Sequence, residues 1–265
     1  MSQLIKEKFA IPLVVFAGLL WSFGPLVVRN MDEPGLVPWQ YLCGRGIVIF
    51  FLLNCYLFFD EGIKFYKNYL KIGISGIIGG VGLGTAMITF IWSITNTSVA
   101  ITLLCLAAMP FITSLLGFLF LREKISFSIW IAIIVATIGL GIMAFDSASL
   151  GSVNGLIFGI ASAFGFSIFS VSLRWRKETP KFTTVAVAGL FCFLFSIVII
   201  IQNDLNFLAS SKNEGLFAVH GTLVCLGLIL YSIGSKTIPA AELTLLSLTE
   251  VIGGIFWVWI PIFGI

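Results

Sequence analysis

The feature that most constrains this chain is a succession of apolar runs, each about 20 residues long. A helix rises about 1.5 Å per residue, so about 20 residues cross a hydrocarbon layer of about 30 Å. Strands of a membrane barrel would need only about 10 residues, with alternating polarity. The pattern therefore predicts an all-α polytopic membrane protein. Nine runs qualify, at approximately 10–28, 37–58, 72–92, 99–120, 126–145, 153–173, 183–201, 216–234 and 240–260.

The composition excludes several other classes of protein. Of the 265 residues, 59% are hydrophobic and 10% are charged, and the mean hydropathy is +1.11. A soluble domain carries about 25% charged residues. A soluble enzyme, a disordered chain and a nucleic-acid binder with a basic surface are therefore excluded. The five cysteines lie in apolar runs without a CxxC spacing, so we expect neither a disulfide framework nor a metal site. We also expect no cofactor.

The basic residues predict an orientation in the membrane. If the N-terminus is cytoplasmic, twelve of the fifteen Lys and Arg residues lie on the cytoplasmic side and only Arg29 and Lys212 on the other. Cytoplasmic loops of membrane proteins carry such an excess. The run at 10–28 is too long for the apolar part of a signal peptide and lacks a cleavage site, so we interpret it as a retained span. We expect a plasma membrane location, in a bacterial inner membrane.

The two halves of the chain match at a constant offset of 141 residues. The clearest segment aligns Gly18–Gly24 with Gly159–Gly165, and Gly80 aligns with Gly221. Shared transmembrane composition is the alternative explanation. Five spans separate equivalent positions, and because five is odd, the halves have opposite orientations, which is typical of secondary transporters.

The offset divides the chain into a first repeat, residues 1–146, and a second repeat, residues 147–265. Residue 124 corresponds to residue 265, so the run at 126–145 has no counterpart in the second repeat. The sequence thus predicts an inverted repeat of five-helix units with nine spans of an expected ten.

Three segments resemble the drug/metabolite transporter superfamily, specifically its EamA-type, ten-span members. They are the Trp21-Ser-Phe-Gly24 stretch, the run Ala107-Ala-Met-Pro110 with its charged exit Leu121-Arg-Glu-Lys124, and Leu248-Thr-Glu-Val251. In the last segment the glutamate of the family pattern is kept and the proline is replaced. The resemblance implies two inverted repeats around a central cavity, alternating access, and small metabolites such as amino acids as cargo, exported more often than imported.

Glu250 is the first candidate for a functional residue. An ionisable group within a bilayer is costly, and this carboxyl group lies near the middle of its run, with Ser247 and Gly254 expected on the same helix face. It could bind a cationic group of the substrate or relay a proton. The alternative is a neutral glutamate that only forms a packing hydrogen bond.

Two other ionisable residues enter the predicted spans at less central positions. Arg45 lies between two glycines, and its planar guanidinium group could bind a substrate carboxylate. Alternatively, its side chain could extend to the lipid headgroups. His220, the only histidine, could titrate near neutral pH. A polar interfacial residue is the interpretation we favour for His220. Glu242 lies at the end of its run and is expected to face the headgroups.

Aromatic, proline and glycine residues add structural expectations. Trp21, Trp92 and Tyr231 lie in spans that line the cavity in the family and could stack on a substrate, although an interfacial or lipid-facing position explains any one of them. Pro25 and Pro110 should kink or break their helices. The small residues at Gly76, Gly80 and Gly84, and at Gly155, Gly159 and Ala163, predict close helix packing.

The leading hypothesis is a secondary transporter, not an enzyme, that moves a small metabolite with protons as a candidate coupling ion. No GxxxxGK[ST] phosphate loop is present, so we do not expect the chain itself to use ATP. A non-transporting membrane subunit or a degenerate remnant is the alternative. An intramembrane lipid-modifying enzyme is favoured less, because paired catalytic groups are missing. Expected partners are the substrate and the bilayer, with a homodimer left open and no nucleic acid.

Overall fold

The computed structural model describes residues 3–123, 127, 130–131, 134–135, 138, 153–176 and 178–259. Within these residues the secondary structure is helical, without a strand, and eight helical segments are long and apolar enough to cross a membrane. These segments correspond to all the predicted runs except 126–145, which lies largely outside the described residues. The all-α polytopic fold is thereby confirmed.

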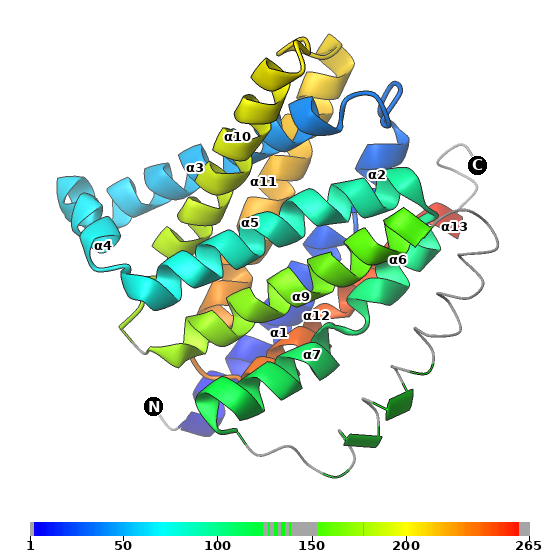
Figure 1. Cartoon of the computed structure of the whole chain (residues 1–265). Helices are drawn as coiled ribbons and strands as arrows, with labels where there is room; N and C mark the ends of the chain where they lie inside the picture. Colours follow the sequence, from blue (N-terminus) through cyan, green and yellow to red (C-terminus); the bar gives the residue numbers. More distant parts are fainter. Residues whose placement is uncertain are drawn as a thin grey trace.

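Figure 1 shows how the helices of the described residues follow one another along the chain. In lipid, each backbone polar group needs a partner within the protein, and a helix provides these partners locally. The helices are α1 (Gln3–Trp21), α2 (Gly24–Arg29), α3 (Pro38–Glu61), η1 (Gly62–Phe65), α4 (Tyr66–Leu70), α5 (Gly73–Asn96), α6 (Val99–Leu106), α7 (Met109–Leu116), η2 (Gly117–Leu121), α9 (Val153–Trp175), α10 (Lys181–Gln202), α11 (Ser211–Gly234), α12 (Ala240–Ser247) and α13 (Thr249–Trp259).

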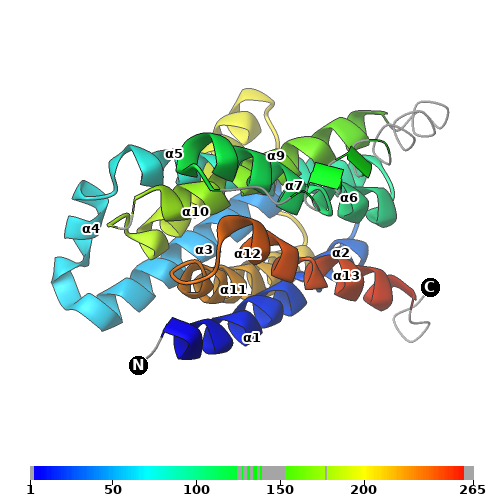
Figure 2. The same cartoon turned by 90° about the horizontal axis from the view of Figure 1, so that it is seen from below.

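Helices from the two halves of the chain interleave. Helix α5 packs against α9 and α10, α10 packs against α3, and α11 packs against both α3 and α1. The shorter helices α6 and α7 lie along α9, while α12 and α13 lie along α1 (Figures 1 and 2). Every long helix of the second half thus has an extensive contact with a helix of the first half.

Glycines on two faces of α5 allow these close contacts. A Cβ atom at Gly80 would lie 3.1 Å from the carbonyl oxygen of Thr184 in α10, and one at Gly82 would lie 3.0 Å from the carbonyl oxygen of Gly165 in α9. Neither backbone can move away easily. The predicted stripe at Gly76, Gly80 and Gly84 packs against α10, as its spacing indicated.

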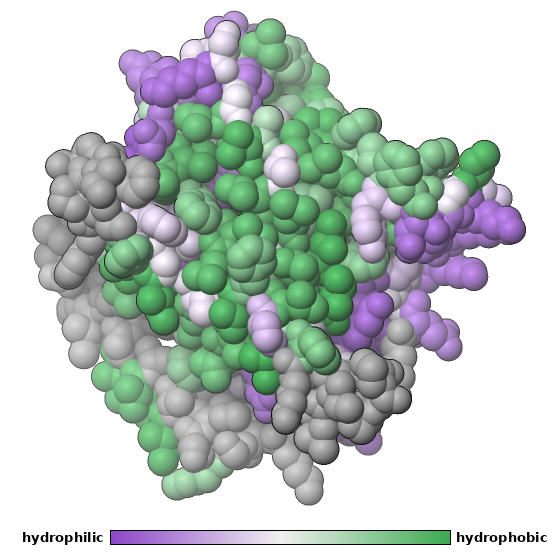
Figure 3. Space-filling model, turned by 180° about the vertical axis from the view of Figure 1, so that it is seen from behind, coloured by the Kyte–Doolittle hydropathy of each residue, from purple (hydrophilic) through white to green (hydrophobic). Residues whose placement is uncertain are grey.

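Between two hydrophilic regions, the surface is a broad hydrophobic face (Figure 3). Large apolar side chains are exposed on the helices, for example Phe51 of α3 at 63% and Ile157 of α9 at 57%. In water such a surface would mark an interaction site or aggregate. Here it matches the hydrocarbon region of a bilayer, with the hydrophilic regions at its two faces.

Three of the membrane segments are interrupted rather than continuous. Helix α1 ends at Trp21 and α2 begins at Gly24 with Pro25 in its first turn, while α6 ends at Leu106 and Pro110 lies in the first turn of α7. Proline is tolerated at these positions because it lacks the amide hydrogen that a first helical turn leaves unpaired. The third break, at Leu248, separates α12 from α13 without a proline.

The segment between the predicted runs 37–58 and 72–92 is also helical. After α3 ends at Glu61, η1 and α4 follow it directly. Gly62 has a φ of 62°, in the left-handed region that glycine adopts easily, and it ends α3. Hydropathy does not identify this segment because most of its side chains are exposed and mixed in polarity.

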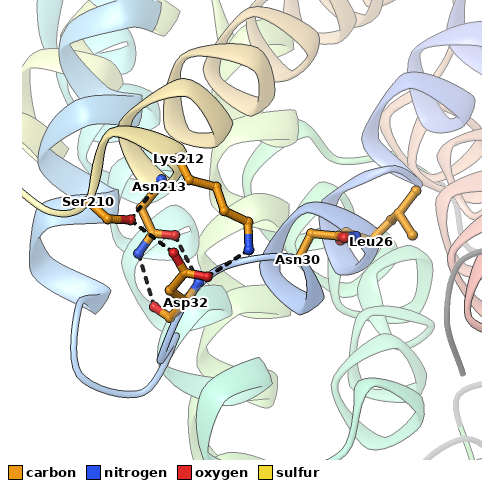
Figure 4. A network of polar contacts seen from close by, with 6 residues as sticks. All are labelled: Leu26, Asn30, Asp32, Ser210, Lys212 and Asn213. Atoms are coloured by element: carbon orange, nitrogen blue, oxygen red, sulfur yellow. Dashed lines mark hydrogen bonds and ion pairs between the residues drawn. The ribbon is translucent and has the colours of Figure 1, made fainter.

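A polar clamp joins the loop after α2 to the start of α11 (Figure 4). The carboxylate of Asp32 accepts hydrogen bonds from Lys212 Nζ at 2.6 Å and Ser210 Oγ at 3.1 Å. The backbone of Asp32 exchanges two further hydrogen bonds with the buried side chain of Asn213, at 2.9 and 3.0 Å. The hydrogen bonds from Lys212 and Ser210 lower the pKa of Asp32. This clamp connects the first half of the chain to the second.

Candidate functional site

A central cavity of about 70 Å³ lies where the interrupted helices meet the long ones. Its wall is mostly apolar, with a few polar groups. The lining residues are Trp21, Arg45, Leu83, Ala86, Met87, Phe90, Leu106, Met109, Ser162, Phe166, His220, Val224, Leu228 and Glu250.

All three helix breaks contribute to the wall of this cavity. Trp21 is the last residue of α1, Leu106 and Met109 flank the break between α6 and α7, and Glu250 is the second residue of α13. Backbone groups near a break are not all used in regular helical hydrogen bonds. In transporters, broken helices of this kind surround the substrate site, because irregular backbone is tolerated where it lines a cavity.

Arg45 projects from α3 and is 3% exposed. Its Nη2 donates a hydrogen bond to the carbonyl oxygen of Met87 at 3.0 Å, and its guanidinium carbon lies 5.3 Å from the ring centre of Tyr41. Among the described residues no carboxylate pairs with this guanidinium, and its Nε has no hydrogen-bond partner. Burial of this side chain disfavours the alternative in which Arg45 extends to the headgroups.

His220 lies in the wall of the same cavity and is 2% exposed. Its Nδ1 forms a hydrogen bond with the hydroxyl group of Tyr41, which also packs edge-on against Phe217 with ring centres 5.1 Å apart. The side chain of His220 therefore faces the interior of the protein, and its interfacial depth stays a prediction. A polar residue in an apolar run can face inward when a partner on a neighbouring helix satisfies it, as Tyr41 does here.

Glu250 is half-buried and faces the cavity from the first turn of α13. The sequence analysis expected Ser247 and Glu250 on the same face of one helix. This expectation is corrected, because the break at Leu248 places the two residues on different helices. The hydroxyl group of Ser247 is fully buried and donates to the carbonyl oxygen of Thr244 at 2.8 Å. It does not line the cavity, and Gly254 packs against Leu103.

The aromatic candidates divide into two groups. Trp21 lines the cavity, donates from Nε1 to the carbonyl oxygen of Val224 at 3.3 Å, and contacts Phe166 edge-on with ring centres 5.5 Å apart. Tyr231 supports Trp21 from behind, also at 5.5 Å between ring centres, and its hydroxyl group is 2.6 Å from Ser170 Oγ.

Trp92 lies away from the cavity, against Trp39 and Phe158, with ring centres 5.3 and 6.1 Å away. Its role as a substrate-stacking residue therefore has no support from the geometry. Together, the structure brings Arg45, His220, Glu250 and Trp21 to one cavity and leaves the other predicted contact residues outside its wall.

The arrangement presents a guanidinium group and a carboxyl group to an apolar space. Arg45 and Glu250 line the same cavity, yet they form no ion pair with each other or with another described residue. A small molecule with a carboxylate and an ammonium group could satisfy both, and the surrounding Leu83, Met87 and Phe166 would contact its apolar part. The low dielectric constant of such a site strengthens both interactions.

Tyr41 and the carbonyl group of Met87 were not identified from the sequence. Tyr41 precedes Arg45 by four residues, so the two lie on one helix face, a signal that could have been used. Nothing in the sequence distinguishes the carbonyl group of Met87 from those of its neighbours. Ser162, which donates to the carbonyl oxygen of Ala86 at 3.0 Å, is one of many serines in apolar runs.

Comparison with known proteins places these features in a family. Residues 8–145 match the model of the EamA-like transporter family. The chain is 25% identical over 261 residues to the uncharacterized transporter YojE of Bacillus subtilis (strain 168), covering 92% of this chain and 82% of the relative. An uncharacterized transporter of Helicobacter pylori (strain J99) is 25% identical over 186 residues, or 69% of this chain and 61% of the relative.

The fold is also similar to that of a protein whose crystal structure has been solved. The two structures share a TM-score of 0.67 at 19% sequence identity, over 98% of this chain and 90% of the other. At this level of identity the similarity concerns the fold alone.

Proposed function

The chain belongs to the EamA-like transporter family, and from this premise we propose that it is a secondary transporter that exports a small zwitterionic metabolite, such as an amino acid, by alternating access. That it is a multi-pass membrane transporter of small molecules follows from the family and the eight apolar helical segments. The substrate class, the direction and the mechanism are our proposals.

One observation carries the choice of substrate class. Arg45 and Glu250 present a guanidinium group and a carboxyl group, unpaired with one another, to a single mainly apolar cavity. A buried charge needs a partner, and a ligand can provide it. Arg45 would hold a carboxylate through its planar fork, and Glu250 would hold an ammonium group. Trp21 and Phe166 would contact the apolar part of the molecule.

Alternating access is supported by how the two halves pack. With an offset of 141 residues, α3 corresponds to α10 and α5 to α11, while α9 corresponds to the α1–α2 pair. The contacts of α5 with α9 and α10 then correspond to those of α11 with α1 and α3, and both sets are present. We propose that residues 1–146 and 147–265 are inverted repeats that rock against each other around the cavity.

We further propose that the transporter lies in the plasma membrane with its N-terminus in the cytoplasm, as the distribution of basic residues indicates. Protons are the coupling ion we propose, with Glu250 as their carrier, because a carboxyl group in the cavity can exchange its proton for a cationic substrate. A homodimer stays a prediction.

The substrate class is tested by competition with matched analogues. The full chain is reconstituted in liposomes, and counterflow of a radiolabelled apolar amino acid is measured after a substrate panel has identified one that is carried. We expect the zwitterion to compete at least tenfold better than the amine or the carboxylic acid alone, since each lost charge-assisted hydrogen bond costs about 1.5–3 kcal/mol. Equal competition by a singly charged analogue would contradict the proposed role of both charges.

A further inference from the structure

Three basic side chains converge on a second hollow, away from the central cavity. Arg174 lies in the last turn of α9, Lys181 is the first residue of α10, and Lys236 follows the end of α11. With Leu173 and Ser235 they line an open hollow of about 370 Å³. Arg174 and Lys181 flank the short loop between α9 and α10, and Lys236 joins them from the end of α11, so the fold brings two separate parts of the sequence together.

Hydrogen bonds hold two of these cations in place. Lys181 Nζ donates to the carbonyl oxygen of Leu173 at 2.8 Å and to Ser235 Oγ at 2.9 Å. Arg174 donates from Nη1 to the carbonyl oxygen of Ile238 at 2.6 Å, and its Nε bonds to Glu123 at 3.2 Å. The basic groups are therefore positioned before any ligand arrives, which lowers the entropy cost of binding.

The positive charge of the hollow is only partly balanced. Glu123 pairs with Arg174, but among the described residues no carboxylate lies within 4.0 Å of the ammonium group of Lys181 or Lys236. Asp60 and Glu61 line a neighbouring hollow that also contacts these two lysines, without forming an ion pair with them. Like charges held together repel, and an anion bound between them would offset this repulsion.

The hollow lies at the depth where a membrane protein meets lipid headgroups. Three membrane segments end or begin at it, namely Val153–Trp175, Lys181–Gln202 and Ser211–Gly234. Lys236 Nζ lies 5.9 Å from the ring centre of Phe182, so a cation and an aromatic ring are adjacent at this edge. Basic pockets between helices at such positions suit phosphate-containing headgroups.

We propose that the hollow formed by Arg174, Lys181 and Lys236 binds a phosphate group, either that of an anionic phospholipid or free phosphate. The ammonium groups of Lys181 and Lys236 would each donate to the phosphate oxygens, with Arg174 adding its charge. The site is separate from the central cavity and does not depend on the proposed substrate or on transport.

The test uses the full chain purified in a neutral detergent, and its thermal unfolding is followed during titration. The probes are short-chain phosphatidylglycerol, short-chain phosphatidylcholine, and inorganic phosphate with sodium chloride at equal ionic strength as its control. Lys236→Gln removes one exposed cation of the hollow, so this variant should fold. Lys67→Gln is the matched control, because Lys67 is exposed in α4 and lies outside the hollow.

We expect a saturable stabilisation, weakened about fivefold in Lys236→Gln and unchanged in Lys67→Gln, since each basic residue contributes about 1 kcal/mol. A response to phosphatidylglycerol but not to phosphate would assign the site to lipid, and a response to phosphate, competing with the lipid, would assign it to the free anion. No saturable response to either, or equal weakening in the two variants, would overturn the proposal.

Discussion

At the scale of single residues, Arg45 is the side chain with the most specific geometry. It is buried, lines the cavity and donates to the carbonyl oxygen of Met87, while its Nε has no hydrogen-bond partner. We expect Arg45→Lys to raise the KM for the carried substrate at least tenfold, because a lysine keeps the charge but cannot form two parallel hydrogen bonds. Initial rates of counterflow over a substrate titration measure this effect.

The matched control for this change is Arg29→Lys, at an exposed arginine in the last turn of α2 that does not line the cavity. Its KM should equal that of the wild type. If Arg45→Lys also transports with an unchanged KM, Arg45 is a structural residue and does not hold a carboxylate.

Ionisable residues could be selected from the sequence because they are rare in apolar runs. Arg45, His220 and Glu250 were found in this way, and the structure brings all three to one cavity. Ser247 does not line the cavity. Its assignment assumed an uninterrupted helix, and no proline or glycine in the sequence indicates the break at Leu248. Backbone partners such as the carbonyl group of Met87 need a three-dimensional structure.

At the scale of helices, the contact between α5 and α9 depends on a pair of glycines. A Cβ atom at Gly165 would lie 2.6 Å from the carbonyl oxygen of Gly82 and 3.0 Å from the amide nitrogen of Ala86. We expect Gly165→Ala to destabilise the protein by about 1–3 kcal/mol, because neither backbone can yield without separating the helices. Thermal unfolding in detergent measures the change.

Gly215→Ala is the control for that substitution. Gly215 lies in helix α11, and nothing lies within 4 Å of the position of its Cβ atom. Alanine there should stabilise the helix by up to about 1 kcal/mol, since it costs less backbone entropy than glycine. A Gly165→Ala variant as stable as Gly215→Ala would show that the two helices are not held at the described distance.

The polar clamp at Asp32 has a defined pH dependence. Hydrogen bonds from Lys212 and Ser210 lower the pKa of this carboxyl group. Its contribution is therefore complete above the pKa of an unfolded aspartate, about 3.9, and is lost only as the pH falls through the lowered value. We expect protection of the backbone amides of residues 30–37 from hydrogen exchange, corrected for intrinsic rates, to be equal at about pH 6 and about pH 8.

Asp32→Asn should reduce this protection at both pH values, because the ion pair with Lys212 is lost. Glu33→Gln, at the exposed neighbouring residue, removes the same charge and should leave the protection unchanged. Loss of protection in both variants would mean that general surface charge, and not the clamp, orders the loop.

The positions of the helices were largely predictable from hydropathy, whereas the residues at which several helices begin or end were not. Helix α11 begins at Ser211, five residues before the predicted run, because Ser210 caps it and accepts from the amide of Asn213 at 3.3 Å. The first turn is polar, so an apolar window excludes it. Serine is a preferred N-cap residue, and recognising Ser210 as the cap would have corrected the boundary.

At the scale of the whole molecule, the orientation is tested by thiol labelling from each side of the membrane. Cysteines at Lys67 and Asp204, both exposed, should react from opposite sides, with the first one cytoplasmic. Labelling is compared with the parent protein, whose Cys105, Cys192 and Cys225 are buried and whose Cys43 and Cys55 are half-buried. Reaction of both new cysteines from the same side would exclude the proposed topology.

The carboxyl group of Glu250 is the central group of the proposed transporter. Glu250 lines the cavity, whereas Glu242, on the preceding helix, is exposed and does not. The most direct test compares Glu250→Gln with Glu242→Gln in proteoliposomes carrying an imposed proton gradient. Insertion of both variants is checked by the amount of protein that stays with the liposomes after flotation.

We predict that Glu250→Gln inserts normally but loses gradient-driven transport, since glutamine cannot exchange a proton, while Glu242→Gln transports like the wild type. Gradient-driven transport by Glu250→Gln at the wild-type rate would contradict the central role of this carboxyl group.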